Sequence, residues 1–107
     1  MMVKSVKDLN PTYSAGNFVV NLSDSSNMSF IKASIVFELE DEDMVEELDK
    51  RKAQIRDEII SILRAQSRKI IEEPGAKTIK SIIQNSINQL LISGQISNVW
   101  FTELVVQ

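Results

Sequence analysis

Two groups of residues in this 107-residue chain have side chains and a spacing that chemistry could use. The first could hold a cation and consists of Asp41, Glu42, Asp43, Glu46 and Glu47. It lacks the glycine and the alternating oxygen donors of a calcium-binding loop. Carboxylates are also favoured where a helix begins, because they cap free N–H groups and meet the positive end of the helix dipole. We therefore interpret the cluster as the start of a helix and predict no metal site.

The second group is Ser29-Phe30-Ile31-Lys32, which has the Ser-x-x-Lys spacing of some serine acylases. That chemistry needs both side chains on one face of a helix, whereas an alternating strand points them to opposite sides. The absence of cysteine and histidine excludes thiol nucleophiles, Cys/His zinc sites and imidazole bases. Three glycines leave no glycine-rich phosphate loop. We predict that the protein is not an enzyme and takes no cofactor.

The charge balance argues against nucleic acid as a partner. Twelve Lys and Arg against fifteen Asp and Glu give a net charge of -3, whereas binding to a phosphate backbone needs a basic face. No run approaches the roughly 18 apolar residues of a membrane-spanning helix, and no signal peptide opens the chain. We expect one soluble globular domain. The doubled start Met1-Met2 leaves open an excised domain whose upstream anchor is missing.

Hydrophobic patterning predicts the strands. Residues 1–17 show little apolar periodicity, so we interpret them as a linker or extended arm and place the domain at residues 18–107. The β-rich runs 18–22 and 29–40 predict a hairpin, and the alternation of the second run predicts one buried face. The run 99–106 predicts the last strand.

Two amphipathic helices are predicted between the second and last strands. Their apolar stripes cover residues 44–63 and 76–91, with Gly94 as the C-terminal cap of the second helix. Glu73-Pro74-Gly75 separates them, and residues 67–73 either extend the first helix or form a short one. Each helix can bury its stripe only against the sheet or the other helix. The sequence therefore predicts an α+β domain with a small β-sheet packed against two long helices.

Packing within such a domain leaves two helical residues unexplained. Arg51 falls on the apolar stripe of the first helix, where a charge must be paired or reach solvent. Glu47, four residues earlier, is its expected partner, and a subunit contact is the alternative. Asn88 lies opposite the apolar stripe of the second helix, so the core does not account for it, and facing solvent is its default.

Aromatic residues on the strands suggest a protein contact. Trp100 and Phe101 are adjacent on a strand and must face opposite ways, so one of them needs a cover from a helix or another subunit. Phe30 and Val36 lie on the nominally polar face of their strand. We therefore predict that the sheet or its edge contacts another protein.

The last third of the chain carries a recognisable pattern. It comprises Ile83, Ile87-Asn88, Leu90-Leu91, Gly94 and Ile96, followed by Val99-Trp100-Phe101-Thr102-Glu103-Leu104-Val105-Val106-Gln107. This pattern resembles the C-terminal signature of the FliL family, the flagellar basal-body-associated proteins. Residues 18–22 and 55–63 match earlier blocks of the family in the same order, so the resemblance spans residues 18–107. Trp100 stands where the family usually has Tyr, and Leu104 where it often has Phe; both keep the apolar character.

The resemblance implies a role in the flagellar motor. FliL-like proteins are single-pass inner-membrane proteins whose periplasmic domain resembles the stomatin (SPFH, band 7) core. They form rings around the ion-driven stator and support its recruitment or activity under load. The resemblance makes this chain the periplasmic domain, with residues 3–17 leading from a membrane helix absent here. Its implied partners are further copies of itself and the periplasmic segment of the stator B subunit. We predict that the contacts include Phe30, Arg51, Asn88 and Trp100.

Two other functions stay open at this point. A generic SPFH-like membrane scaffold unconnected with flagella would share the fold, and association with a motor would separate the two. A carboxylate-based hydrolase would need two carboxyl groups roughly 5 to 9.5 Å apart in a cleft. A structure with the Asp and Glu residues only on helix surfaces would exclude it.

Overall fold

Three antiparallel strands form a single sheet in a computed structural model, which describes residues 10–22 and 29–107. Strand β1 (Thr12–Asn21) and strand β3 (Ile96–Val106) both pair with the central strand β2 (Phe30–Leu39). The helical segments lie between β2 and β3 in the chain and are η1 (Glu42–Met44), α2 (Val45–Lys50), α3 (Lys52–Ala65), α4 (Arg68–Ile71), η2 (Pro74–Ala76) and α5 (Lys77–Leu90). The predicted α+β fold is confirmed.

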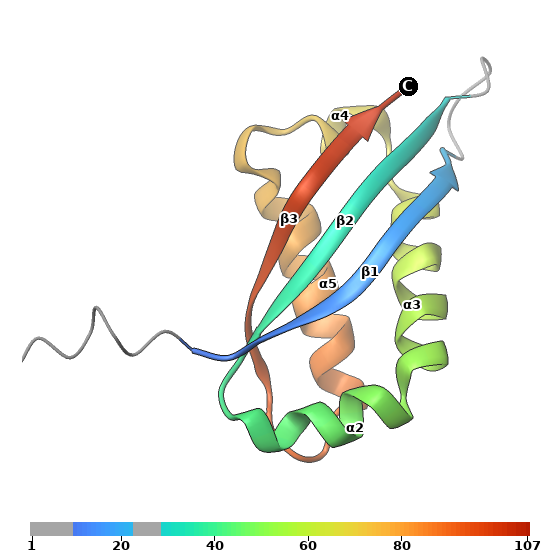
Figure 1. Ribbon diagram of the computed structural model, residues 1–107. Helices are drawn as coiled ribbons and strands as arrows, with labels where there is room; N and C mark the ends of the chain where they lie inside the picture. Colours follow the sequence, from blue (N-terminus) through green and yellow to red (C-terminus); the bar gives the residue numbers. More distant parts are fainter. Residues whose placement is uncertain (1–9, 23–28) are drawn as a thin grey trace, which may run out of the picture.

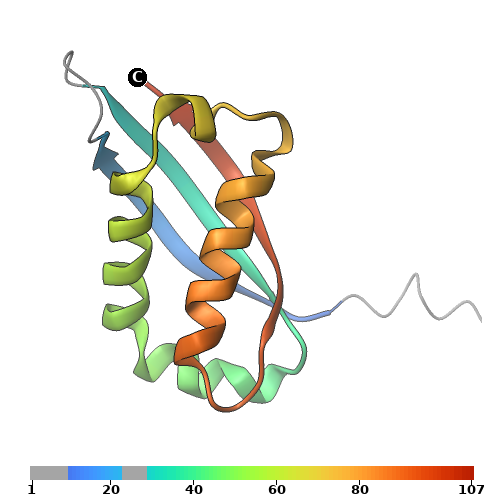
Figure 2. The same ribbon diagram turned by 180° about the vertical axis from the view of Figure 1, so that it is seen from behind.

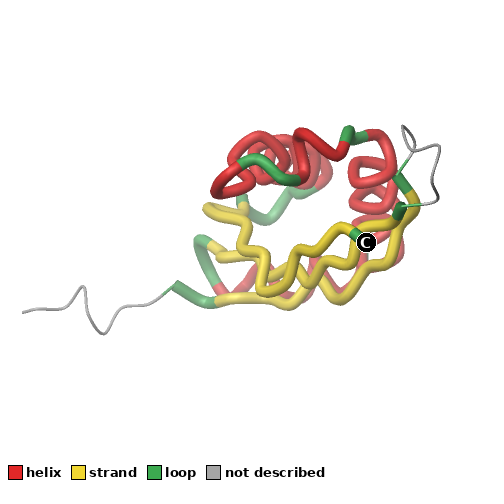
Figure 3. The backbone as a smooth tube through the Cα atoms, turned by 90° about the horizontal axis from the view of Figure 1, so that it is seen from above, coloured by secondary structure: helices red, strands yellow, loops and turns green. Residues whose placement is uncertain are grey.

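The long helices lie side by side on one face of the sheet (Figure 2). Helix α3 packs against β1 and helix α5 against β3, while α2 runs across one end of the sheet (Figure 1). Seen from above, the helices and strands form two layers (Figure 3). The alternation in β2 produces this arrangement, because its inward side chains are all buried in the single core: Ile31, Ala33, Ile35, Phe37 and Leu39.

Strand β1 begins at Thr12 rather than at Phe18, which corrects the sequence-based start of the sheet. The expected arm therefore loses residues 12–17 to the strand, and its residues 1–9 lie outside the described part of the chain. A bulge between Ser14 and Gly16 shifts the register against β2. The extra residue breaks the alternation of buried and exposed side chains that identifies a strand in sequence.

The predicted first helix is in fact two helices, with the break at Arg51. The backbone of Arg51 leaves the helical region (φ −97°, ψ 15°). The bend turns α2 across the end of the sheet while α3 runs along its face (Figure 1), and Leu48 and Ile55, on either side of the bend, are both buried in the core. The helical spacing of apolar residues continues through the bend, because both helices bury their apolar residues in the same core. Periodicity alone therefore indicates one helix.

Two connections in the helical layer settle further expectations. Helix α4 is separate from α3, and the Ser67 hydroxyl caps it by accepting a hydrogen bond from the Ile70 N–H (3.3 Å). The expectation that Gly94 caps α5 is wrong, because the helix ends at Leu90 and Leu91 is already extended. Gly94 instead lies against Met44, whose sulfur would be 3.0 Å from an added Cβ.

Candidate protein interface

The face of the sheet turned away from the helices carries exposed apolar side chains from the two outer strands, β1 and β3. Val19 is 66% exposed, Trp100 44% and Val105 40%. The register joins Val19, Lys32 and Val105 in one cross-strand row. Apolar side chains that share an uncovered sheet face favour a protein contact over a purely solvated surface.

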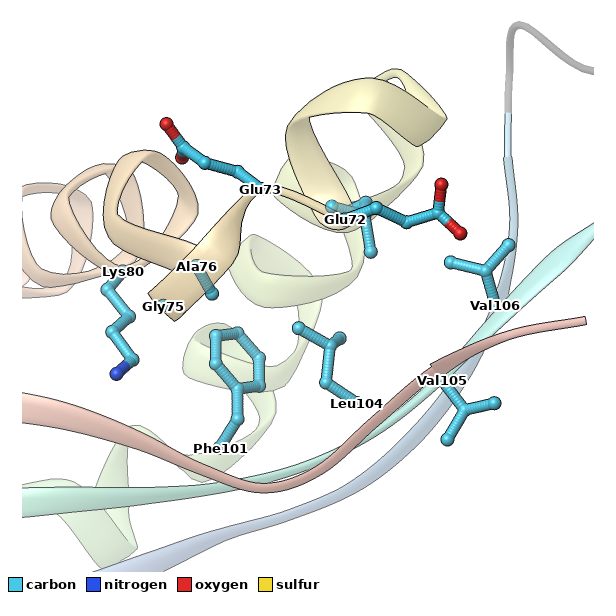
Figure 4. Close-up of a pocket in the computed structure, with 10 residues that line it drawn as sticks. Glu72, Glu73, Gly75, Ala76, Lys80, Phe101, Leu104, Val105 and Val106 are labelled. Atoms are coloured by element: carbon cyan, nitrogen blue, oxygen red, sulfur yellow. The ribbon is translucent and has the colours of Figure 1, made fainter.

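Trp100 and Phe101 face opposite sides of β3, as expected. Phe101 is half-buried and packs against the core, and it points toward the helical layer (Figure 4). Trp100 pairs with Val36 of β2 on the outer face. The Lys80 ammonium lies 5.6 Å from the centroid of the Trp100 ring, so the ring retains exposed area beside a positive charge.

Phe30 lies on the same outer face of the sheet as Trp100 but is not close to it. It is the first residue of β2, half-buried, and pairs with Asn21 of β1. Its backbone exchanges two hydrogen bonds with Gln107, at 2.9 and 2.8 Å. Two cross-strand rows separate it from Trp100, so these residues could meet a partner together only if that partner spanned the sheet face.

The pairing of Arg51 with Glu47 is confirmed. The Arg51 Nε donates to Glu47 Oε2 at 2.7 Å, and the Glu47 side chain is only 13% exposed. Arg51 also donates to the Gln54 side chain at 3.1 Å. Glu47 neutralises the charge at the α2–α3 bend without a second subunit, and Gln54 accepts a further hydrogen bond; a subunit contact stays a prediction.

Glu47 also holds the loop between α5 and β3. Its carboxylate accepts the backbone N–H groups of Ile92 (3.0 Å) and Ser93 (2.8 Å) and the Ser93 hydroxyl (2.6 Å). The hydrogen bond from the Ser93 side chain, followed by the backbone donors and Arg51, lowers the pKa of Glu47 from 4.5 to about 2 although partial burial opposes this. Sequence reasoning missed this role because it assigned Glu47 to the helix start.

Asn88 fixes the point where this loop becomes β3. Its Nδ2 donates to the Ile96 carbonyl (3.1 Å), and its Oδ1 accepts the Ile96 N–H (2.7 Å). The default expectation that Asn88 faces solvent is therefore wrong: the side chain is half-buried, and its amide bonds to both backbone groups of Ile96, the first residue of β3. The predicted subunit contact of Asn88 is not needed to satisfy its side chain, and stays a prediction.

The carboxylates in the described part of the chain form no metal-binding cluster. Residues 10–22 and 29–107 contain no group of three Asp or Glu placed to hold a metal ion. A groove of about 630 Å³ lies between β3 and the turn at 72–76 and includes Glu72 and Glu73. Their carboxylates point in different directions (Figure 4). The groove thus gives the hydrolase alternative no facing pair.

Comparison with known proteins identifies the family. The family described as flagellar basal body-associated protein FliL matches residues 12–107. Its matched region is the whole sheet and every helix described above. The chain belongs to the FliL family.

Two FliL relatives support this assignment. The flagellar protein FliL of Aquifex aeolicus (strain VF5) is 34% identical over 91 residues, which cover 84% of this chain and 56% of that protein. The flagellar protein FliL of Bacillus subtilis (strain 168) is 31% identical over 80 residues, covering 74% and 57%. The chain thus spans about half the length of the relatives it matches. None of its described helices is long and apolar enough to cross a bilayer.

The chain should lose stability in acid because the pKa of Glu47 is lowered in the folded state. Its pKa is about 2 when folded and 4.5 in the reference state, so the stabilisation is complete above about pH 4.5 and is lost as the pH falls toward 2. Glu73, whose pKa is lowered by the backbone N–H of Thr78, acts in the same direction. Urea unfolding between pH 2 and 7 measures the effect. Glu47→Gln should flatten the acid limb; an unchanged slope in this variant would contradict the assignment.

Proposed function

We propose that the chain is the periplasmic domain of a non-enzymatic flagellar motor protein, which assembles into a ring around the stator and supports its recruitment or activation. Its partner is the periplasmic segment of the stator B subunit, and a membrane helix preceding this chain anchors it in the inner membrane. Membership of the FliL family supports the motor role. The open sheet face with Val19, Trp100 and Val105 supports a binding role.

Anchoring in a membrane allows this mechanism to work with weak contacts between copies. Copies held at one surface have a high effective concentration, so individually weak contacts act together. A ring of copies could then hold the periplasmic segment of each stator unit in an extended, conducting state. The stomatin-like core implied by the resemblance fits this assembly role and is part of the proposal.

Motility under load tests the motor role. A strain that lacks the full-length gene should swim and spread progressively worse than its parent as viscosity rises, and a plasmid copy should restore it. Stator units labelled with a fluorescent protein should leave the motor sooner in the deletion strain. An unchanged swimming speed at every viscosity would refute the stator mechanism and favour a membrane scaffold unconnected with flagella.

Trp100→Ala is the sharpest substitution for this interface. Among the predicted contacts Phe30, Arg51, Asn88 and Trp100, only Trp100 combines large exposed area with a side chain not needed to satisfy an internal hydrogen bond. We expect the variant to fold normally, by circular dichroism, and to reduce swimming at high viscosity by half or more. Asp57→Ala, an exposed change on α3, is the control; equal effects of the two substitutions would contradict a contact at Trp100.

A further inference from the structure

Half of the free edge of β3 is available for pairing. Among residues 10–22 and 29–107, strand β3 pairs only with β2, so every second backbone N–H and C=O group points away from the sheet. Near its start, Gln84 and Asn88 donate to the Ile96 carbonyl, and Asn98 accepts the Val99 N–H. In the described part of the chain, no side chain bonds to the backbone of residues 100–106. This stretch is the open edge.

The opposite edge of the sheet is partly covered. On β1 the Arg56 guanidinium lies 4.3 Å from the centroid of the Phe18 ring and donates to the Asn17 carbonyl at 3.2 Å. The bulge at Gly16 further interrupts this edge. Bulges and covering side chains are ways in which proteins protect sheet edges. The two edges are therefore not equivalent, and β3 is the one prepared for an added strand.

A groove runs beside the open edge. The turn at residues 72–76 projects past β3 (Figure 1), and the space beneath it has a volume of about 630 Å³. Ala76 forms its roof, while Phe101 and Leu104 point into it from β3 (Figure 4). Both side chains are only half-buried. A strand added to this edge could place apolar side chains in the groove.

The sequence of β3 is complementary to itself. A bulge places Thr102 between the residues that pair with Ser34 and Ile35 of β2, and both Thr102 and Glu103 are exposed. A two-fold axis between them, perpendicular to the sheet, sets a second β3 antiparallel to the first. Each facing pair then lies on the same side of the sheet: Val99 with Val106, Trp100 with Val105, Phe101 with Leu104, and Thr102 with Glu103. Apolar residues face apolar residues, and the bulges face each other.

The charged side chains beside the groove are also complementary under this two-fold axis. Lys80 lies at the Trp100 end of the segment, and Glu72 lies at the Val106 end (Figure 4). The two-fold axis exchanges these ends, so Lys80 of each copy approaches Glu72 of the other. Opposite charges placed by symmetry favour this pairing over a parallel one.

We propose that two copies of this chain pair through the open edges of β3, about a two-fold axis between Thr102 and Glu103, to form one six-stranded sheet. The pairing deepens, and rests on, the self-association part of the proposed function. It is isologous and closes at two copies. A ring would therefore be built from pairs joined by a second surface.

Disulfide trapping tests the register directly, because the chain contains no cysteine. Across the proposed axis, equivalent Thr102 Cα atoms would lie about 6 Å apart, within disulfide range. Under mild oxidation, Thr102→Cys should give at least tenfold more covalent dimer than Ser14→Cys, an exposed position on β1. Circular dichroism establishes that both variants fold. Equal dimer yields from the two variants, or none from Thr102→Cys, would overturn the proposal.

A charged substitution provides the second measurement. Val105→Lys would place an ammonium group opposite Trp100 and beside Lys80 of the second copy, where like charges repel, whereas Val19→Lys alters the other edge in the same cross-strand row. Trp100 is the single tryptophan, so pairing should shift its emission to the blue as concentration rises. Val105→Lys should abolish the shift, and Val19→Lys should preserve it. A shift that survives Val105→Lys would overturn the proposal.

Sedimentation separates failure of this inference from failure of the proposed function. Oligomers that persist in Val105→Lys with no Thr102→Cys dimer would show self-association through another surface, which leaves the ring proposal standing. A chain that stays monomeric at millimolar concentration, with no disulfide, would overturn the edge pairing. The stator mechanism would then be decided by the motility experiment alone.

Discussion

Glu47→Ala should lower the free energy of unfolding by about 3 kcal/mol, because its carboxylate accepts hydrogen bonds from two segments far apart in the chain. Alanine would leave the backbone N–H groups of Ile92 and Ser93 without their acceptor. It would also remove the partner of Arg51 at the bend between α2 and α3. Urea unfolding at pH 7, followed by circular dichroism, measures the loss.

A neighbouring carboxylate supplies the matched control. Glu46 is highly exposed, and its ion pair with Lys50, at 3.7 Å, is a surface pair on one helix. Such pairs contribute about 0.5 kcal/mol or less, so Glu46→Ala should leave the unfolding midpoint nearly unchanged. Similar losses from Glu46→Ala and Glu47→Ala would show that helix charge, rather than the hold on the loop, is responsible. Glu47→Gln, which keeps an acceptor but no charge, should fall between them.

The contacts of Glu47 link the acidic cluster to the candidate interface. The loop at 91–95 leads directly into β3, which carries Trp100 and Val105. Glu40 holds this loop at the Gln95 N–H (3.2 Å), and Asn88 holds Ile96. Gln84 also donates to the Ile96 carbonyl, so four polar side chains fix where β3 enters the sheet. Loss of Glu47 should disturb the interface as well as lower stability.

Burial periodicity explains which parts of the fold were predictable. The alternation in residues 30–39 and the stripe on residues 77–90 reflect which side chains the layers bury, and the structure confirms both. The partner of Arg51 was predictable because residues four apart meet on a helix. The resemblance to the family could be recognised because its pattern combines these periodic blocks with the terminal strand.

Contacts between segments that are far apart in the sequence produce no comparable periodic pattern. Glu47 and Ser93 are far apart in sequence, and no spacing rule joins a helix-start carboxylate to a loop on the other side of α5. Asn88 was singled out only because the core does not account for it, and its position off the apolar stripe predicted a side chain facing solvent; nothing identified Ile96 as its partner. The shape of the β3 edge likewise depends on how the turn at 72–76 folds over it.

Gly16→Val should lower the free energy of unfolding by about 3 kcal/mol. Gly16 lies at the bulge in β1 whose extra residue prevented the start of this strand from being predicted. Gly16 has φ +108°, which β-branched residues strongly disfavour. An added Cβ would also lie 2.7 Å from Arg56 Nη1, so the guanidinium would have to leave Phe18 and Asn17. The edge of β1 would then lose its cover.

The control for Gly16→Val is Ser14→Val, which introduces the same side chain two residues away on the exposed face of β1. Valine is favoured at such a position, so this variant should be neutral or slightly stabilising in urea unfolding. A loss as large as that of Gly16→Val would mean that the strand tolerates no valine at all, and the backbone argument would fail. A loss confined to Gly16→Val would show that the bulge, which no alternation rule anticipates, sets the register by which Phe18 and Val20 reach the core.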